Sequence, residues 1–105
     1  MYWLDIVYRI MYLSKGEYKL LGFEKSSRTG KKYDAILEHK ETKKKRRMPF
    51  GDSSMENYRD ITGLNLYPNL IHNDKKRRRL FRSRHKGYLR DGYWSPSYFS
   101  YYFLW

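Results

Sequence analysis

The chain contains no cysteine, which excludes disulfide bonds, thiolate zinc sites and cysteine nucleophiles. Acidic residues are also few: 11 Asp and Glu stand against 23 Lys and Arg, and the formal net charge is +12. Such an imbalance attracts phosphate-rich or carboxylate-rich partners and destabilises a lone compact state through self-repulsion. The missing cysteines fit a reducing compartment, and the excess of cations points to an acidic or polyanionic partner.

Long apolar runs are absent as well. Residues 1–13 are largely apolar, but they include Asp5 and Arg9 and are too few to span a membrane. The stretch also lacks a basic start and a small-residue cleavage site, so we expect neither a signal peptide nor a membrane span.

Catalytic motifs are missing too. The only histidines are His39, His72 and His85, and none has a metal-binding spacing. The chain has no glycine-rich phosphate loop and no nucleophile elbow, and its carboxylates occur singly. We therefore predict that the protein is not an enzyme, and we assign no catalytic residue, metal ligand or cofactor.

What the chain does have is enough apolar and aromatic material for one domain. At 105 residues, one compact domain with a modest core is expected. Disordered chains contain few aromatic residues. The 20 aromatics of this chain, of which 12 are Tyr, therefore argue against full disorder. We divide the chain into an apolar extension over residues 1–16, either strand or helix, and a single α+β domain over residues 17–105.

The first half of that domain has the pattern of strands. Residues 18–25, 32–40 and 44–50 are predicted strands, joined by a polar loop over 26–30 and a short turn near 41–42. In the middle strand, alternate residues Tyr33, Ala35 and Leu37 form an apolar face. This pattern predicts a small three- to four-stranded antiparallel sheet with one covered face.

The second half has helix signals. Ser53 and Glu56 have capping-box spacing, which predicts a short helix through Asp60. Asn73 or Asp74 can cap a helix that runs to about residue 86 and stops at Gly87. Ser95 and Pro96 predict the start of a final helix. The fold class expected is α+β, a sheet followed by two or three helices.

The helix predicted near residues 75–86 carries the strongest functional signal. Its face with Leu80 and Phe81 has few apolar members, and we expect the helix to dock through those two residues. Its candidate polyanion-binding residues are Lys75, Arg78, Arg79, Arg82 and Lys86. Arg guanidinium groups match phosphate and carboxylate oxygens bidentately. The alternative is a solvated cationic face or ion pairs with the chain's own acids.

A second basic cluster lies at the start of the last predicted strand. It consists of Lys43, Lys44, Lys45, Arg46 and Arg47. Lysine at a sheet edge discourages edge-to-edge pairing, and the same composition is typical of nucleic-acid patches. The two interpretations carry equal weight, and polyanion contact of this type would weaken steeply with salt.

The last thirteen residues include eight aromatics, too many for one small sheet to cover. Exposed apolar patches of that size usually mark a partner. The candidate partner-docking residues are Tyr98, Phe99, Tyr101, Tyr102, Phe103 and Trp105. We favour a division in which half the block completes the core and half meets a neighbouring chain, over the alternative of base stacking.

The order of these features resembles a family of small basic proteins with an uncharacterised domain, encoded by giant nucleocytoplasmic large DNA viruses. The matching features are Phe50-Gly51 closing a sheet, His72 and Asp74 before a basic helix, Arg84-His85 at its end, and the final segment 100–105. The resemblance covers residues from about 18 to 105. It implies a viral setting and brings no established activity.

In that viral setting, the expected function is that of a structural component of a giant-virus particle, either a minor capsid protein or an internal virion protein. Its basic residues would bridge acidic protein surface or genome, and its partners would be other virion or assembly proteins. The expected location is the virion, or the host cytoplasm or nucleus during assembly. The alternative is a nucleic-acid-binding protein, viral or ribosomal in type, with DNA or RNA as its partner.

Overall fold

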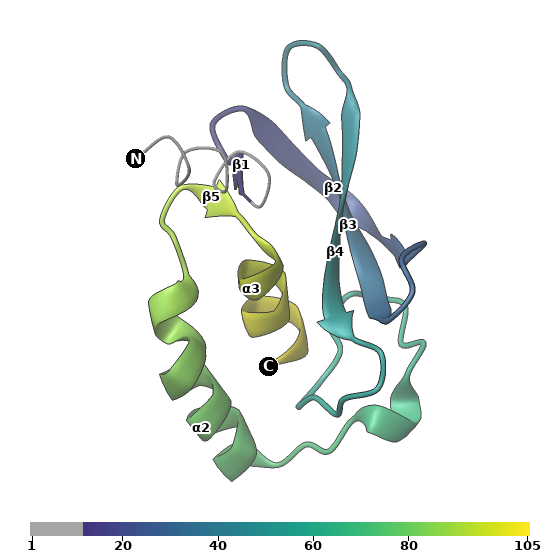
Figure 1. Cartoon of the computed structure of the whole chain (residues 1–105), viewed down its shortest axis with the longest axis vertical. Helices are drawn as coiled ribbons and strands as arrows, with labels where there is room; N and C mark the ends of the chain where they lie inside the picture. The colour runs from purple at the N-terminus through teal and green to yellow at the C-terminus, as the bar shows by residue number, and fades with distance from the viewer. Residues whose placement is uncertain (1–11) are drawn as a thin grey trace.

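The computed structural model describes residues 12–105, and its centre is a three-stranded antiparallel sheet (Figure 1). The strands are β2 (Tyr18–Lys25), β3 (Lys31–His39) and β4 (Lys45–Asp52), in the order β2-β3-β4. Helices follow the strands, so the predicted α+β class and the meander are confirmed. Residues 1–11 of the predicted extension lie outside the described residues.

The core lies on the predicted apolar face of β3. Tyr33, Ala35 and Leu37 are completely buried there, beside Phe50 of β4. Phe50 also packs on Phe99 from the C-terminal segment, with ring centroids 5.4 Å apart. The strand alternation therefore predicted the covered face correctly, and the C-terminal aromatics cover it.

Residues 13–16 belong to the domain and not to a separate extension. β1 (Leu13–Ser14) pairs antiparallel with β5 (Tyr93–Trp94). Leu13 is part of the core cluster, and the Lys15 amide donates a hydrogen bond of 2.8 Å to the Gly92 carbonyl. The predicted boundary at residue 16 is therefore misplaced.

The short helix predicted from Ser53 to Asp60 does not form, and that prediction is wrong. The segment forms turns and an isolated parallel bridge between Asn57 and Ile71. The Lys32 ammonium donates to the Met55 carbonyl, at 2.7 Å, and to the Asn57 amide oxygen. These bonds hold the segment across the end of the sheet, and they override the local capping signal.

Two helical segments complete the fold. After a 3₁₀ turn, η1 (Pro68–Leu70), come α2 (Lys75–His85) and the 3₁₀ turn η2 (Lys86–Tyr88). α3 (Pro96–Phe99) then continues into a π-helical turn, η3 (Ser100–Leu104). The Ser95 hydroxyl accepts from the Tyr98 amide at 3.1 Å, which confirms the predicted cap. Figure 1 shows α3 between the sheet and α2.

Candidate functional site

The basic helix α2 begins where the sequence predicts. The Asp74 carboxylate caps it by accepting from the Arg77 amide at 3.1 Å and the Lys76 amide at 2.9 Å. These bonds, that of Arg77 first, lower the pKa of Asp74 and keep it ionised. A negative charge at the N-terminus of a helix also interacts favourably with the helix dipole. One acid therefore caps a helix in which seven of the eleven residues are Lys or Arg.

A stack of rings attaches α2 to the rest of the protein. The Phe81 ring lies 4.2 Å from the Trp105 ring with only 2° between their planes, and its other neighbour, His85, is 4.0 Å away. Leu80 takes no part in this contact and is 52% exposed. The predicted docking of the helix is therefore right for Phe81 and wrong for Leu80.

Two of the predicted polyanion-binding arginines face this same attachment. The Arg78 Nε donates a 2.6 Å hydrogen bond to the Trp105 backbone oxygen, and its guanidinium lies over the Tyr58 ring. The Arg82 guanidinium lies over the Tyr101 ring, 4.4 Å from its centre. Both arginines are half-buried and pack on aromatic neighbours. Their binding to a polyanion stays a prediction, and these contacts make them less accessible than the exposed cations of the helix.

The remaining cations of α2 and η2 are exposed. Within residues 12–105, the only ion pair of this segment joins Arg77 to Glu56, at 3.0 Å. The other exposed basic side chains, which we call the helix cations, are Lys75, Lys76, Arg79, Arg84 and Lys86. Among the described residues no carboxylate neutralises them, so ion pairing with the chain's own acids explains little of this charge.

The second basic cluster surrounds the turn between β3 and β4. Lys43 has a positive φ of 63° in that turn, and β4 is an edge strand, as expected. Four of the five side chains are exposed and make no ion pair with any residue of 12–105; these hairpin cations are Lys43, Lys44, Lys45 and Arg46.

Arg47 differs from its four neighbours because it belongs to an internal ion-pair network. Its Nε donates to the buried Asp34 carboxylate at 2.8 Å, and Glu24 lies 3.5 Å from its Nη1. Burial alone would raise the pKa of Asp34, but hydrogen bonds from Ser26 and Arg47 outweigh it and lower the pKa. Arg47 therefore keeps a buried carboxylate ionised. Its side chain is still 43% exposed, so its assignment to polyanion binding stays a prediction.

The aromatic C-terminal segment turns mostly inward. Phe99 is completely buried, and Phe103 packs on Phe23 with ring centroids 4.6 Å apart. Trp105 lies between Phe81 and His72. The partner-docking assignment is therefore wrong for Phe99, and the packing of Phe103 and Trp105 is intramolecular.

Three tyrosines of the C-terminal segment, Tyr98, Tyr101 and Tyr102, are accessible enough to contact a partner. Tyr102 is 40% exposed, whereas Tyr98 and Tyr101 are half-buried. Tyr98 lies under the Lys15 ammonium at 4.0 Å, as Tyr101 lies under Arg82. Docking through these three tyrosines stays a prediction, with Tyr102 as its most accessible member.

The two sets of exposed cations lie far apart. In Figure 1 the β3–β4 turn stands at the top of the molecule, and α2 runs down to the bottom. The longest dimension of the molecule is 39 Å. Since the Debye length is about 8 Å at physiological ionic strength, the hairpin cations and the helix cations act as two separate electrostatic surfaces.

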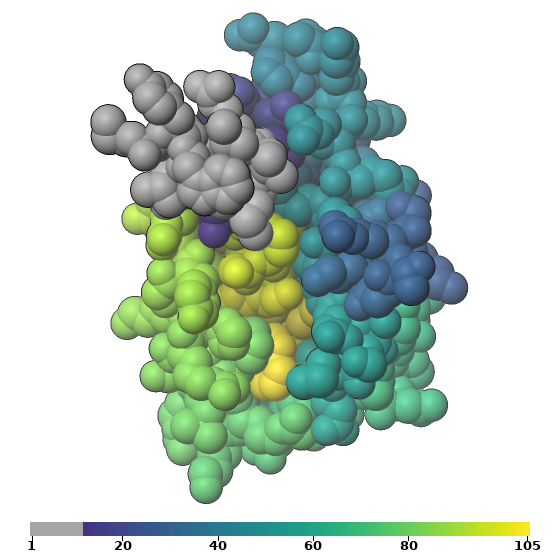
Figure 2. Space-filling model, in the orientation of Figure 1, coloured from purple at the N-terminus to yellow at the C-terminus, as the bar shows by residue number. Residues whose placement is uncertain are grey.

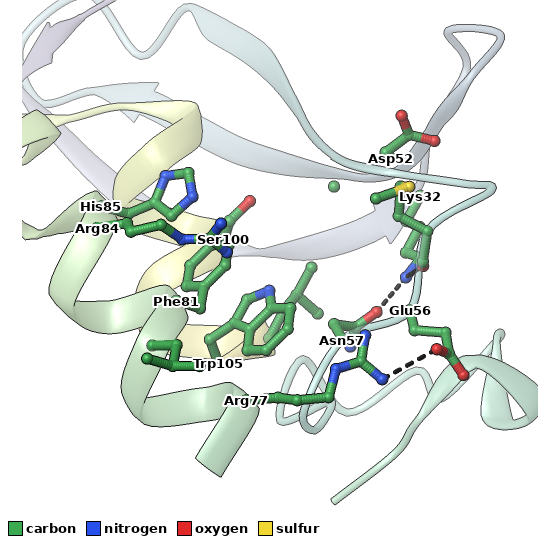
Figure 3. A pocket seen from close by; sticks show the side chains of 14 residues that line it. Lys32, Asp52, Glu56, Asn57, Arg77, Phe81, Arg84, His85, Ser100 and Trp105 are labelled. Atoms are coloured by element: carbon green, nitrogen blue, oxygen red, sulfur yellow. Dashed lines mark hydrogen bonds and ion pairs between the residues drawn. The ribbon is translucent and has the colours of Figure 1, made fainter. Parts of the chain in front are cut away.

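A pocket of about 420 Å³ lies between α2 and the chain that leaves β4. Figure 2 shows the C-terminal segment recessed between α2 and the β4 side of the molecule. Figure 3 shows Arg77, Phe81, Arg84 and His85 reaching from α2 toward the pocket, opposite Lys32 and Asn57. Its apolar lining comes from Met55, Leu80, Phe81, Leu104 and Trp105.

This pocket was not expected from the sequence, because its residues come from distant segments. Lys32 was counted as part of a strand, yet it is buried. Burial lowers the pKa of Lys32, and the carboxylates of Asp52 and Asp60 only partly offset that effect. The only sequence signal for its burial was a lysine next to the apolar residues of a strand. That signal does not identify the Asn57 amide as the partner of Lys32.

The histidines act as packed rings. Burial, and after it the charge of Arg77, lowers the pKa of His72; burial, and after it the charge of Arg84, lowers that of His85. Both imidazoles are therefore uncharged at neutral pH. In the described part of the chain, no three acidic, histidine or cysteine side chains gather as metal ligands would.

No family model, no curated protein and no solved structure matches this chain. Over residues 12–105 the structure has no helix that is both long and apolar enough to cross a membrane.

Proposed function

We propose that the protein is a structural component of a giant-virus particle that bridges two acidic surfaces, one at each end of the molecule. The observation that supports this function is the separation of the helix cations from the hairpin cations (Figure 1). A protein with one nucleic-acid site would need its cations on one continuous surface. Two surfaces toward opposite ends of a molecule that is 39 Å long can hold two partners at once.

The viral setting of the proposal rests on the resemblance of residues 18–105 to small basic proteins of giant nucleocytoplasmic DNA viruses. In that setting the protein would be a minor capsid or internal virion protein. Its partners would be acidic faces of other virion proteins or the genome, met in the virion or in the host cytoplasm or nucleus during assembly. The exposed Tyr102 would then contact a neighbouring chain at the edge of the bridge.

The alternative function is that of a nucleic-acid-binding protein, viral or ribosomal in type. It is favoured by the row of helix cations on one α-helix, since lysine and arginine on a helix suit phosphate contact. Single-strand binding by base stacking has less support, because the terminal rings pack on one another.

A salt titration tests whether the two clusters bind polyanions. The wild type and two variants would be titrated with duplex DNA and with polyglutamate at about 50 and about 200 mM salt. One variant replaces Lys43, Lys44, Lys45 and Arg46 with glutamine; the other does the same to Lys75, Lys76, Arg79 and Lys86. Each set of four should lower the magnitude of the DNA salt slope by up to about 3.6.

An Arg28→Gln variant is the control, because Arg28 is exposed in the loop between β2 and β3 and belongs to neither cation cluster. Equal slopes in the wild type and in both fourfold variants would show that these cations do not bind polyanions, and the proposal would fail.

A further inference from the structure

The pocket beside α2 offers an apolar interior that the fold leaves unfilled. Its volume of about 420 Å³ is in the range of protein sites that hold a ligand. Met55 and Leu80, which are 61% and 52% exposed, stand at its opening. An apolar group that enters between them would be removed from water together with both side chains, which favours binding.

The rings of the pocket favour an aliphatic group over a nucleobase. Phe81 has Trp105 on one face, at 4.2 Å, and His85 on the other, at 4.0 Å. The second face of Trp105 is turned toward His72, at 5.0 Å. A stacked base needs a free ring face, and both faces of Phe81 and of Trp105 have ring neighbours. The pocket therefore presents ring edges, against which an aliphatic side chain packs without a stacking partner.

The charges of the pocket favour one carboxylate in the ligand. Arg77 is already paired with Glu56. Asp52 is held by the Ser54 amide and hydroxyl, at 2.9 and 2.7 Å. Arg84 lines the same pocket and has no carboxylate partner among residues 12–105. Lys32 also lines the pocket, but its ammonium is buried and already donates to the Met55 carbonyl and the Asn57 amide oxygen. Arg84 is exposed, so a ligand carboxylate can pair with it.

We propose that this pocket binds an extended peptide segment of a partner protein, in which an aliphatic residue lies two positions from an acidic residue. Arg84 follows Leu80 by four positions on α2, a rise of about 6 Å. In an extended peptide, side chains two residues apart share a face and are separated by about 6.6 Å. The aliphatic side chain would enter beside Leu80 and Phe81 while the acid pairs with Arg84.

This inference goes beyond the bridging function and does not require it. The pocket lies on the face of α2 that carries Leu80 and Arg84, whereas bridging depends on the other helix cations and on the hairpin. Loss of peptide binding in the pocket would leave the salt-dependent binding of DNA and polyglutamate intact, so the two proposals fail separately.

The experiment is an NMR titration of the whole chain with blocked five-residue peptides. The probes are Gly-Leu-Gly-Glu-Gly and its reverse, Gly-Glu-Gly-Leu-Gly, because the spacing does not define chain direction. At least one should shift the amides of residues 51–57 and 77–85. Replacing its Leu by Gly should weaken binding about tenfold or more, and replacing its Glu by Gln should weaken it about threefold.

Two variants assign the acid to its arginine. In Arg84→Gln protein, the Glu and Gln peptides should bind equally, as a double-mutant cycle requires for a broken pair. Arg79→Gln is the matched control, because Arg79 is also exposed on α2 but does not line the pocket. It should leave the difference between the two peptides unchanged.

Several results would overturn the proposal. Absence of shifts at the pocket, or equal binding without Leu, would show that no aliphatic side chain enters. An equal effect of Arg79→Gln would mean that the attraction is nonspecific. Equal binding of oligothymidylate at the same amides would assign the pocket to single-stranded nucleic acid. Equal binding of 4-methylpentanoate would assign it to small aliphatic acids.

Discussion

Arg78 and Arg79 are adjacent on α2 and give a sharp test of which side of the helix a polyanion can reach. Arg78 bonds the Trp105 backbone oxygen at 2.6 Å and covers the Tyr58 ring at 4.8 Å. Arg79 is exposed and makes no such contact. Replacing each with alanine in turn should therefore separate stability from binding.

The magnitudes follow from these contacts. A hydrogen bond to a charged group contributes about 1.5–3 kcal/mol and a cation–π contact at an exposed site about 0.5–1 kcal/mol. Since Arg78 is half-buried, we expect its alanine variant to lose about 1.5 kcal/mol, which lowers Tm by about 6–12 °C. The Arg79 variant should change stability by less than about 0.5 kcal/mol but lower the DNA salt slope by about 0.9.

Thermal melts followed by circular dichroism measure the first effect, and DNA titrations across a salt series measure the second. If Arg78→Ala lowers the salt slope while Arg79→Ala lowers Tm, the orientation described for α2 is incorrect. Equal effects of the two variants on both quantities would contradict it as well.

Three further predictions concern the fold that carries these surfaces. Phe99→Ala should cost about 3–5 kcal/mol in urea denaturation because Phe99 is fully buried. Tyr102→Ala should cost only about 1 kcal/mol, because Tyr102 is 40% exposed and its ring packs on Tyr98 and Tyr101. Gly51→Ala should cost about 1 kcal/mol more than Gly30→Ala in thermal melts: both glycines have positive φ, but only at Gly51 would a Cβ meet a side chain, at 3.0 Å. The pKa of Asp34 in the folded protein lies below its reference value of 3.8. Its contribution to the free energy of unfolding is therefore complete above about pH 4 and is lost as the pH falls through the folded pKa. Asp34→Asn should remove this part of the pH dependence of stability, measured by acid unfolding.

The sheet and the positions of the main helices could be predicted because their signals are local. Alternation in β3 identified the covered face, and Asp74 and Ser95 cap helices as their positions indicate. The helix expected after Ser53 failed because Lys32, more than twenty positions earlier, holds Met55 and Asn57 through hydrogen bonds. A capping signal contributes about 1 kcal/mol, which tertiary contacts of this kind can exceed.

The orientation of the basic helix could not be read from its own residues. Leu80 and Phe81 are adjacent, so they point about 100° apart on a helix. Phe81 stacks on Trp105, whereas Leu80 is 52% exposed. Trp105 and Tyr101, from a distant segment, determine that Phe81 and Arg82 face inward. Likewise, no local sequence pattern distinguishes Arg47 from its four basic neighbours. The difference is its ion pair with the buried Asp34, which lies on another strand.

The C-terminal aromatics show the same dependence on distant partners. Their number suggested a docking surface, but the sheet leaves a face that Phe99 and Leu104 fill. Cutting the chain after residue 94 would therefore remove part of the core, and it cannot serve as a test of partner docking. Substitution of the exposed Tyr102 alone is the appropriate variant.

The claim that the protein bridges two acidic surfaces is tested most directly by a capture assay. Polyglutamate is fixed to a surface, the protein is bound to it, and capture of labelled duplex DNA is measured, with sedimentation confirming that the protein is monomeric. We expect the wild type and the Arg28→Gln control to capture DNA, and both fourfold variants, each lacking one cation cluster, to bind polyglutamate without capturing DNA. Undiminished capture by either variant, or no capture by the wild type, would contradict the account.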